Sequence, residues 1–144
     1  NHWKKIKLFA TNFLPCENCG QRYNIEIPGE LLDHFGKNIG LLCEKYGKVA
    51  IWGLNYHSVR IFDLVKELND DRIFPVDSSE IKQQLVLNSK EVFAPKTIKD
   101  KDIKAVVIVI SAYYNQIALQ IKYEFPNVER VIDICSLLDD KADI

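Results

Sequence analysis

The sequence predicts an α/β domain with a small, doubly wound, mostly parallel sheet, preceded by a helix and an N-terminal extension. From residue 48 onward, short apolar runs alternate with segments of helical periodicity. The run KAVVIVIS (104–111) is continuously apolar, which is typical of a strand buried on both faces of a parallel sheet. The run KVAIWG (48–53) ends in a glycine turn that leads into a helical segment, as in a βα unit.

Composition and length limit the class of protein. The 144 residues suffice for one domain, and 47% hydrophobic with 27% charged residues is ordinary for a globular protein. A net charge of −1 gives no broad basic surface, so we expect no nucleic-acid partner. The longest apolar run is far shorter than a membrane helix, so we predict no membrane span. The four cysteines are too few for a disulfide scaffold and the α/β pattern suits a reducing cytoplasm, so we predict a cytoplasmic location. Because the chain contains no methionine, we interpret it as a piece of a larger protein or a processed product.

Two units are expected along the chain. Residues 1–29 form an extension with a Cys-x-x-Cys knuckle, interpreted as the tail of an upstream domain. Residues 30–144 form the α/β domain, with a leading helix at 30–46 and a core at 48–135. The predicted order within that core is a strand at 48–53, a helix at 57–69, a strand at 72–77, a polar irregular segment with a short extended piece at 91–95, a strand at 104–111, a helix at 114–125 and a strand at 129–134.

The leading helix contains two glycines, Gly36 and Gly40, and each weakens a helix by up to about 1 kcal/mol relative to alanine. Their spacing would allow close packing against another element, and the alternative is a break near Gly36. Gly47 is a natural stop signal.

The turn after the first strand has the position of a phosphate-binding turn. The dinucleotide fingerprint places glycine at three positions, which here are Gly53, Asn55 and Ser58. Gly53 suits the tight turn, Asn55 tolerates a positive φ but fills space that a pyrophosphate would use, and Ser58 is small and could cap the helix. The turn therefore fits a loose nucleotide site that also includes Leu54, an empty cleft, or simply a strand joined to a helix.

Asp77 ends the second predicted strand, 24 residues after Gly53. An acidic residue about 20 residues beyond the glycines is where a ribose hydroxyl is held. The alternative is a capping box formed by Asp77 and Glu80. We include Asp77 and the adjacent Ser78 among the candidate binding residues.

The segment SAYYNQ (111–116) follows the strongest strand and would form the third wall of the site. Ser111 could cap the next helix, and Tyr113 could cover a base or a sugar. Tyr114 falls on the apolar face of that helix and is expected in the core. His57, at the start of the first crossover helix, could contact a phosphate or act as an acid or base, so His57 and Tyr113 are weak catalytic candidates.

Cys16 and Cys19 in PCENCG have the spacing of half a zinc site. No second pair is present, so further ligands would come from an upstream part or a second chain. Zinc, a disulfide and free thiols all stay open.

The run from KVAIWG to KAVVIVISAYYNQIALQI resembles a group of small Rossmann-like domains appended to enzymes of sugar-nucleotide and surface-glycan metabolism in bacteria. It is similar to the C-terminal domain of sugar C-methyltransferases and the N-terminal domain of glycan-pathway O-acyltransferases. The resemblance covers about 95 residues, and its features fall on Gly53, Asp77 with Lys82, 93–95 and Ser111. The chain departs from the pattern in lacking the second glycine of the turn and the glycine after the lysine.

The resemblance implies a module that binds a nucleotide or nucleotide-sugar for a larger enzyme, with an upstream catalytic domain as partner. S-adenosylmethionine is a further ligand that this group suggests, and a homodimer is compatible with it. Two alternatives stay open. The first is a fragment of a methyltransferase or of a nucleotide-dependent oxidoreductase, and the second is a structural assembly domain with an empty cleft. No Asp/Glu pair, Ser-His-Asp set or Tyr-x-x-x-Lys pattern lies where it would suggest catalysis by this chain.

Overall fold

A computed structural model describes residues 28–144 of the chain, apart from the side chains of Tyr56 and His57. The prediction for Cys16 and Cys19, and nearly all of the predicted extension, lie outside these residues. The elements are α2 (Gly29–Tyr46), β1 (Val49–Trp52), α3 (Tyr56–Leu64), η1 (Lys66–Asn69), β2 (Ile73–Val76), η2 (Lys82–Gln84), β3 (Val86–Leu87), β4 (Lys90–Glu91), α4 (Thr97–Asp100), β5 (Ala105–Ile108), η3 (Ser111–Tyr113), α5 (Tyr114–Glu124), β6 (Arg130–Asp133) and η4 (Ile134–Leu138), where η denotes a 3₁₀ helix.

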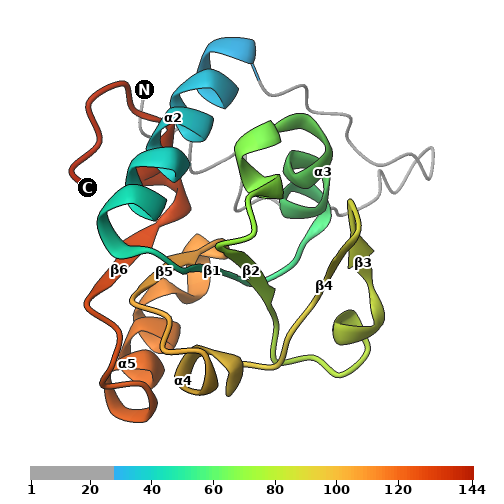
Figure 1. The fold of residues 1–144 in the computed structure, drawn as a ribbon, viewed down its shortest axis with the longest axis vertical. Coiled ribbons are helices and arrows are strands. Elements are labelled where there is room, and N and C mark those ends of the chain that lie inside the picture. Colours follow the sequence, from blue (N-terminus) through green and yellow to red (C-terminus); the bar gives the residue numbers. More distant parts are fainter. Residues whose placement is uncertain (1–27) are drawn as a thin grey trace.

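The predicted fold class is confirmed. Four parallel strands form one sheet in the order β2-β1-β5-β6 (Figure 1). Residue 49 pairs with residue 73 on one side and with residue 105 on the other, so β1 and β5 are the central strands. The chain adds β2 on one side of β1 and then crosses to the other side for β5 and β6. The strand order therefore reverses between β1 and β5, which is where doubly wound sheets hold ligands.

Helices cover both faces of the sheet. Val49 and Ile51 of β1 point into a cluster with α2, α3 and η4, whereas Ala50 and Trp52 point into a cluster with α4 and α5. This alternation follows from the two-residue period of a strand. The crossover helices α3 and α5 lie on opposite faces because β2 and β6 were added in opposite directions, and crossovers of one hand require that arrangement.

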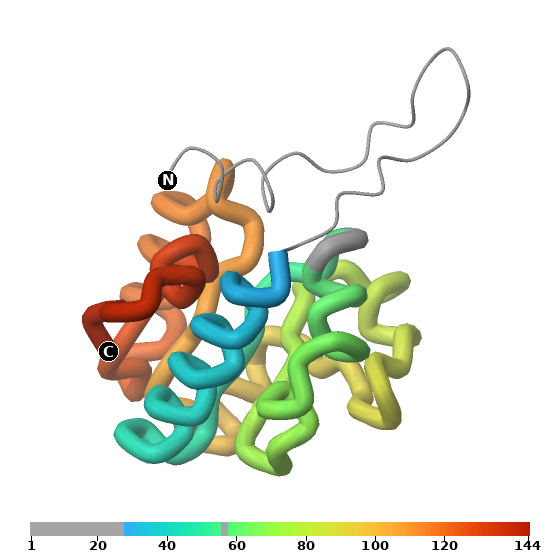
Figure 2. Tube along the Cα trace, turned by 90° about the horizontal axis from the view of Figure 1, so that it is seen from above, coloured from blue at the N-terminus to red at the C-terminus, as the bar shows by residue number. Residues whose placement is uncertain are grey.

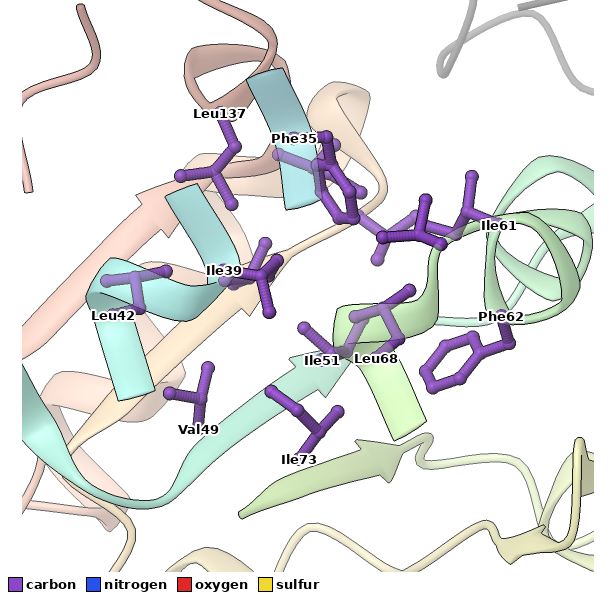
Figure 3. Close-up of a cluster of buried hydrophobic side chains, with 14 of the residues drawn as sticks. Phe35, Ile39, Leu42, Val49, Ile51, Ile61, Phe62, Leu68, Ile73 and Leu137 are labelled. Atoms are coloured by element: carbon purple, nitrogen blue, oxygen red, sulfur yellow. The ribbon is translucent and has the colours of Figure 1, made fainter. Parts of the chain in front are cut away.

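The leading helix packs directly on the sheet. Figure 3 shows Phe35, Ile39 and Leu42 of α2 gathered over Val49 and Ile51 of β1. These three helix residues are fully buried and recur at three- and four-residue spacing, as the sequence predicts.

The helix α2 is continuous, so the break considered near Gly36 does not occur. A Cβ on Gly36 would lie 2.6 Å from the carboxylate of Glu67 in η1, which means that this glycine does allow close packing. Gly40 has nothing within 4 Å of its Cβ position. Close packing therefore explains one of the two glycines. Gly47, with a φ of 79°, follows the helix as its C-cap.

The C-terminal segment lies alongside α2 (Figures 1 and 2). The buried Asn38 side chain donates to the carbonyl oxygens of Leu137 and Asp139, at 2.8 and 2.9 Å. His34 Nδ1 lies 3.1 Å from the Leu138 oxygen, and Lys45 Nζ donates to the Ile144 oxygen at 2.8 Å. Polar side chains of α2 thus satisfy backbone carbonyls at the end of η4, which no helical bond would satisfy.

Two elements differ from the prediction. The helix predicted at 57–69 ends at Leu64, because Val65 adopts extended backbone angles, and the short helix η1 follows. This break turns both Val65 and Leu68 into the core. The polar segment after β2 contains a small hairpin, β3–β4, and Phe93 in the predicted extended piece forms a parallel bridge with Val76. None of the described helices is both long and apolar enough to cross a membrane.

Candidate functional site

The turn after β1 lies where the strand order reverses, as a ligand site requires. Gly53 has a φ of 103°, a conformation that favours glycine. A Cβ at this position would lie 3.3 Å from a side-chain carbon of Ile110. The glycine therefore makes room for the chain's own Ile110, and its presence needs no phosphate to explain it.

Asn55 and Ser58 form a reciprocal capping box at the start of α3. The Asn55 side chain accepts from the Ser58 N–H at 2.9 Å, and the Ser58 hydroxyl accepts from the Asn55 N–H at 2.7 Å. Asn55 has a φ of −137°, so its tolerance of positive φ is not used here. Ser58 thus takes part in capping, as expected, but from the third helical position, and Asn55 is the N-cap.

Asp77 holds the turn from the neighbouring strand. Its carboxylate is 6% exposed and accepts from the Leu54 N–H at 2.8 Å through one oxygen. The other oxygen accepts from the Ser79 N–H, also at 2.8 Å. Both oxygens are thus bound to the backbone, whereas a ribose site would leave them directed at the ligand. The capping-box alternative also differs from the structure, because the next short helix, η2, begins at Lys82 with Ile81 as its N-cap.

The loop after β2 closes over the same turn. Lys82 Nζ donates to the Leu54 oxygen at 2.8 Å and lies 3.9 Å from the Asp77 carboxylate. The Gln83 amide donates to the Asp77 carbonyl at 2.8 Å. This "Asp77–Lys82 clamp", made of Leu54, Asp77, Lys82 and Gln83, joins the ends of β1 and β2 through side chains.

Four backbone donors of this region are used within the protein. The N–H groups of Gly53, Leu54, Asn55 and Ser58 donate to Val76, Asp77, Ser58 and Asn55, respectively. A phosphate-binding turn instead directs several such groups at its ligand. These four donors of the β1 turn are therefore satisfied by the protein's own groups.

The end of β5 is more open. Ser111 does not cap α5, because the N-cap position is Tyr113 and no side chain caps it. The Ser111 hydroxyl instead donates to Asp133 Oδ1 at 2.9 Å. Tyr113 is 55% exposed, as expected, and Tyr114 packs partly buried against the core, also as expected.

Among the other predicted residues, Leu54 is buried and contributes its backbone to the clamp, and Ser78 is exposed. The backbone of His57 lies in the first turn of α3, and its side chain is outside the described structure. The fold thus brings Gly53, Asp77 and Ser111 to the same edge of the sheet, as predicted, and gives each of the three a partner within the protein.

Asp133 and Cys135 were not predicted at this edge. Asp133 Oδ1 accepts both from Ser111 and from the Cys135 N–H, at 2.9 Å each, and so caps η4. Cys135 Sγ lies 3.4 Å from the Ser111 hydroxyl. An acidic residue at the end of a strand, followed by a short helical turn, is a signal that could have indicated this cap.

Among the described side chains, which leave out that of His57, no three from His, Cys, Asp or Glu are grouped so as to hold a metal ion. Cys43 and Cys135 are both buried, and burial raises the pKa of Cys43 to about 11. A thiol with a raised pKa is a poor nucleophile and a poor metal ligand at neutral pH.

The strand order, the two helical layers and the turn at the reversal point define a small Rossmann-like α/β domain. Comparison with protein-family models finds no matching family, and comparisons with curated proteins and with solved structures find no significant match. The fold class is thus established by the architecture of the chain itself.

Proposed function

We propose that this chain is a non-catalytic accessory module of a larger glycan-pathway protein, and that it binds a nucleotide or nucleotide-sugar at the carboxyl edge of its sheet. Two features support a ligand at this edge: the reversal of strand order between β1 and β5, and the exposed aromatic ring of Tyr113 just beyond β5. The resemblance to domains of sugar-nucleotide enzymes supports the ligand class.

The observation that carries the binding mode is the internal closure of the β1 turn. Since the Asp77–Lys82 clamp and the Asn55–Ser58 capping box use the donors that would hold a diphosphate, the ligand would bind on the β5 side. There, Tyr113 offers a flat surface on which a base or a sugar ring can stack. We therefore expect recognition of the base or sugar with weak phosphate contacts.

A second candidate is a structural assembly module whose cleft holds no ligand. The same closure of the turn favours it, because a turn that satisfies its own donors is stable without a bound anion. The two candidates differ in one measurable property, which is stabilisation by ligand.

The test is a thermal-shift panel on the 144-residue chain with UDP-sugars, NAD(P), S-adenosylmethionine and coenzyme A. A ligand at 100 times its Kd stabilises a protein by about 2.7 kcal/mol, which a melting curve resolves readily. We expect a shift with a nucleotide or nucleotide-sugar that Tyr113→Phe retains, because the ring is kept, and that Tyr113→Ala loses. If millimolar concentrations of every compound leave the melting temperature unchanged, the assembly role replaces the binding role.

A further inference from the structure

The helix α5 exposes apolar side chains that its packing does not require. Leu119 is 55% exposed and Tyr123 is 76% exposed, and they are four residues apart on one helix. Residues at this spacing lie one above the other on the helix surface. The core-facing positions Tyr114, Ile117, Ile121 and Phe125 belong to a different side of α5.

A groove of about 370 Å³ lies on the adjacent side of the same helix. Its lining is mostly apolar and comes from α5, the turn after it and the edge strand β6: Ala118, Ile121, Lys122, Phe125, Pro126, Val128, Glu129 and Val131. With 3.6 residues per turn, Ala118, Lys122, Leu119 and Tyr123 follow one another around the helix in that order. The exposed Leu119–Tyr123 pair therefore continues the wall of the groove, and we call the whole surface the α5 face.

We propose that the α5 face is the interface of a homodimer related by a two-fold axis, in which Tyr123 of each copy fills the groove of the other. A two-fold interface uses the same patch twice, so it requires a projection and a hollow on one surface. The α5 face has both, an exposed aromatic side chain beside an apolar groove of a size that can receive it. Tyrosine is also the kind of residue on which interfaces depend most strongly.

The charges on this face are self-complementary. Lys122 and Glu129 line the same groove and carry opposite charges. In a two-fold dimer, a contact between Lys122 of one copy and Glu129 of the other occurs twice, since each residue is present on both sides. A partner with a different surface would need to supply this pattern independently, so a second copy is the occupant that the face fits.

A second exposed apolar group provides an internal control. Ile81, Leu85 and Val86 are exposed in and around η2 and β3, in a different part of the fold. None of these three residues lines the groove beside α5. A substitution at Val86 changes exposed apolar area to a similar degree without touching the α5 face.

Sedimentation of the full 144-residue chain from about 1 μM to about 1 mM, where modest interfaces dissociate, tests the proposal. We expect a reversible monomer–dimer equilibrium that Tyr123→Ser weakens by at least about tenfold in Kd, as for a central aromatic contact. Val86→Ser should leave the Kd unchanged.

The charge pair gives the more specific result. Lys122→Glu and Glu129→Lys should each weaken the dimer, and the double variant Lys122→Glu with Glu129→Lys should restore it. A chain that stays monomeric throughout, a dimer indifferent to Tyr123→Ser, equal sensitivity to Val86→Ser, or a double variant weaker than both single variants would each overturn the proposal. Circular dichroism of every variant establishes that the fold is kept, and none of these residues belongs to the ligand edge described above.

Discussion

Replacing Asp77 by asparagine is the sharpest test of how the β1 turn is held. The carboxylate offers one oxygen to the Leu54 N–H and the other to the Ser79 N–H. An asparagine keeps one carbonyl oxygen and places an NH₂ group where the second oxygen was. One of the two backbone N–H groups then faces a donor and loses its partner.

The loss of stability in Asp77→Asn follows from the number of hydrogen bonds that it removes. A buried donor left without a partner costs about 1–3 kcal/mol, and hydrogen bonds to a charged acceptor lie at the upper end. The attraction between Asp77 and Lys82 adds at most about a few tenths of a kcal/mol, because the lysine side chain is 43% exposed and screened by water. We expect Asp77→Asn to lower the free energy of unfolding by about 2–3 kcal/mol, and Asp77→Ala, which removes both acceptors, by about 3–5 kcal/mol.

Urea unfolding monitored by circular dichroism measures this loss as a lower midpoint with an unchanged slope. Asp71→Asn is the matched control, since Asp71 is an exposed carboxylate near the same strand, and its effect should stay within about 0.5 kcal/mol. If Asp77→Asn is as mild as this control while nucleotide binding falls, the carboxylate serves a ligand and the clamp interpretation is wrong.

Gly53→Ala should destabilise the fold by about 1–3 kcal/mol, because alanine is strained at a φ of 103°. Gly40→Ala should stabilise the fold by about 0.5–1 kcal/mol, because nothing lies within 4 Å of the Cβ position of Gly40. Urea midpoints that move in the same direction for both variants would contradict these two expectations. Asn38→Ala should cost about 1–3 kcal/mol through two lost bonds to backbone carbonyls, and hydrogen exchange should accelerate first in the C-terminal segment. The Arg72 guanidinium, hydrogen-bonded to Asp70, lowers the pKa of that carboxyl to about 2, so the pair stabilises the fold above about pH 4 and loses this contribution as the pH falls through 2. Because Asp70 is partly exposed, the contribution of the pair should stay below about 1 kcal/mol. In urea titrations, the difference in the free energy of unfolding between the wild type and Asp70→Asn should therefore decrease from pH 4 to pH 2. A difference that stays constant over this range would refute the expectation.

The sequence predicts those parts of the fold that depend on local pattern. The apolar runs around residues 50 and 107 are strands because each is buried on both faces, and such burial leaves a continuous signal. The start of α3 was predicted within one residue, at 57 against Tyr56, but Asn55 was not predicted as its N-cap.

The partners of the candidate site residues depend on tertiary register and could not be predicted in the same way. Asp77 reaches the Leu54 N–H only because residue 76 lies beside residue 52 in the sheet. The Ser111 hydroxyl likewise meets Asp133 because β5 and β6 are neighbours with their ends aligned. A short side chain after a strand looks the same in sequence whether it faces a ligand or another loop, so the prediction of a ligand role for Asp77 and Ser111 stays untested.

The bonds between α2 and the C-terminal segment have a consequence for the order in which the protein folds. Asn38 and His34 contact backbone groups that are 99, 101 and 104 positions away in sequence. During synthesis, α2 and β1 leave the ribosome long before η4 exists, so the flank of α2 that η4 covers stays exposed until η4 has been made. Contacts of such long sequence separation slow folding and leave apolar surface open to other chains in the meantime. We therefore expect chains truncated before residue 134 to aggregate, even though every strand of the sheet is present in them.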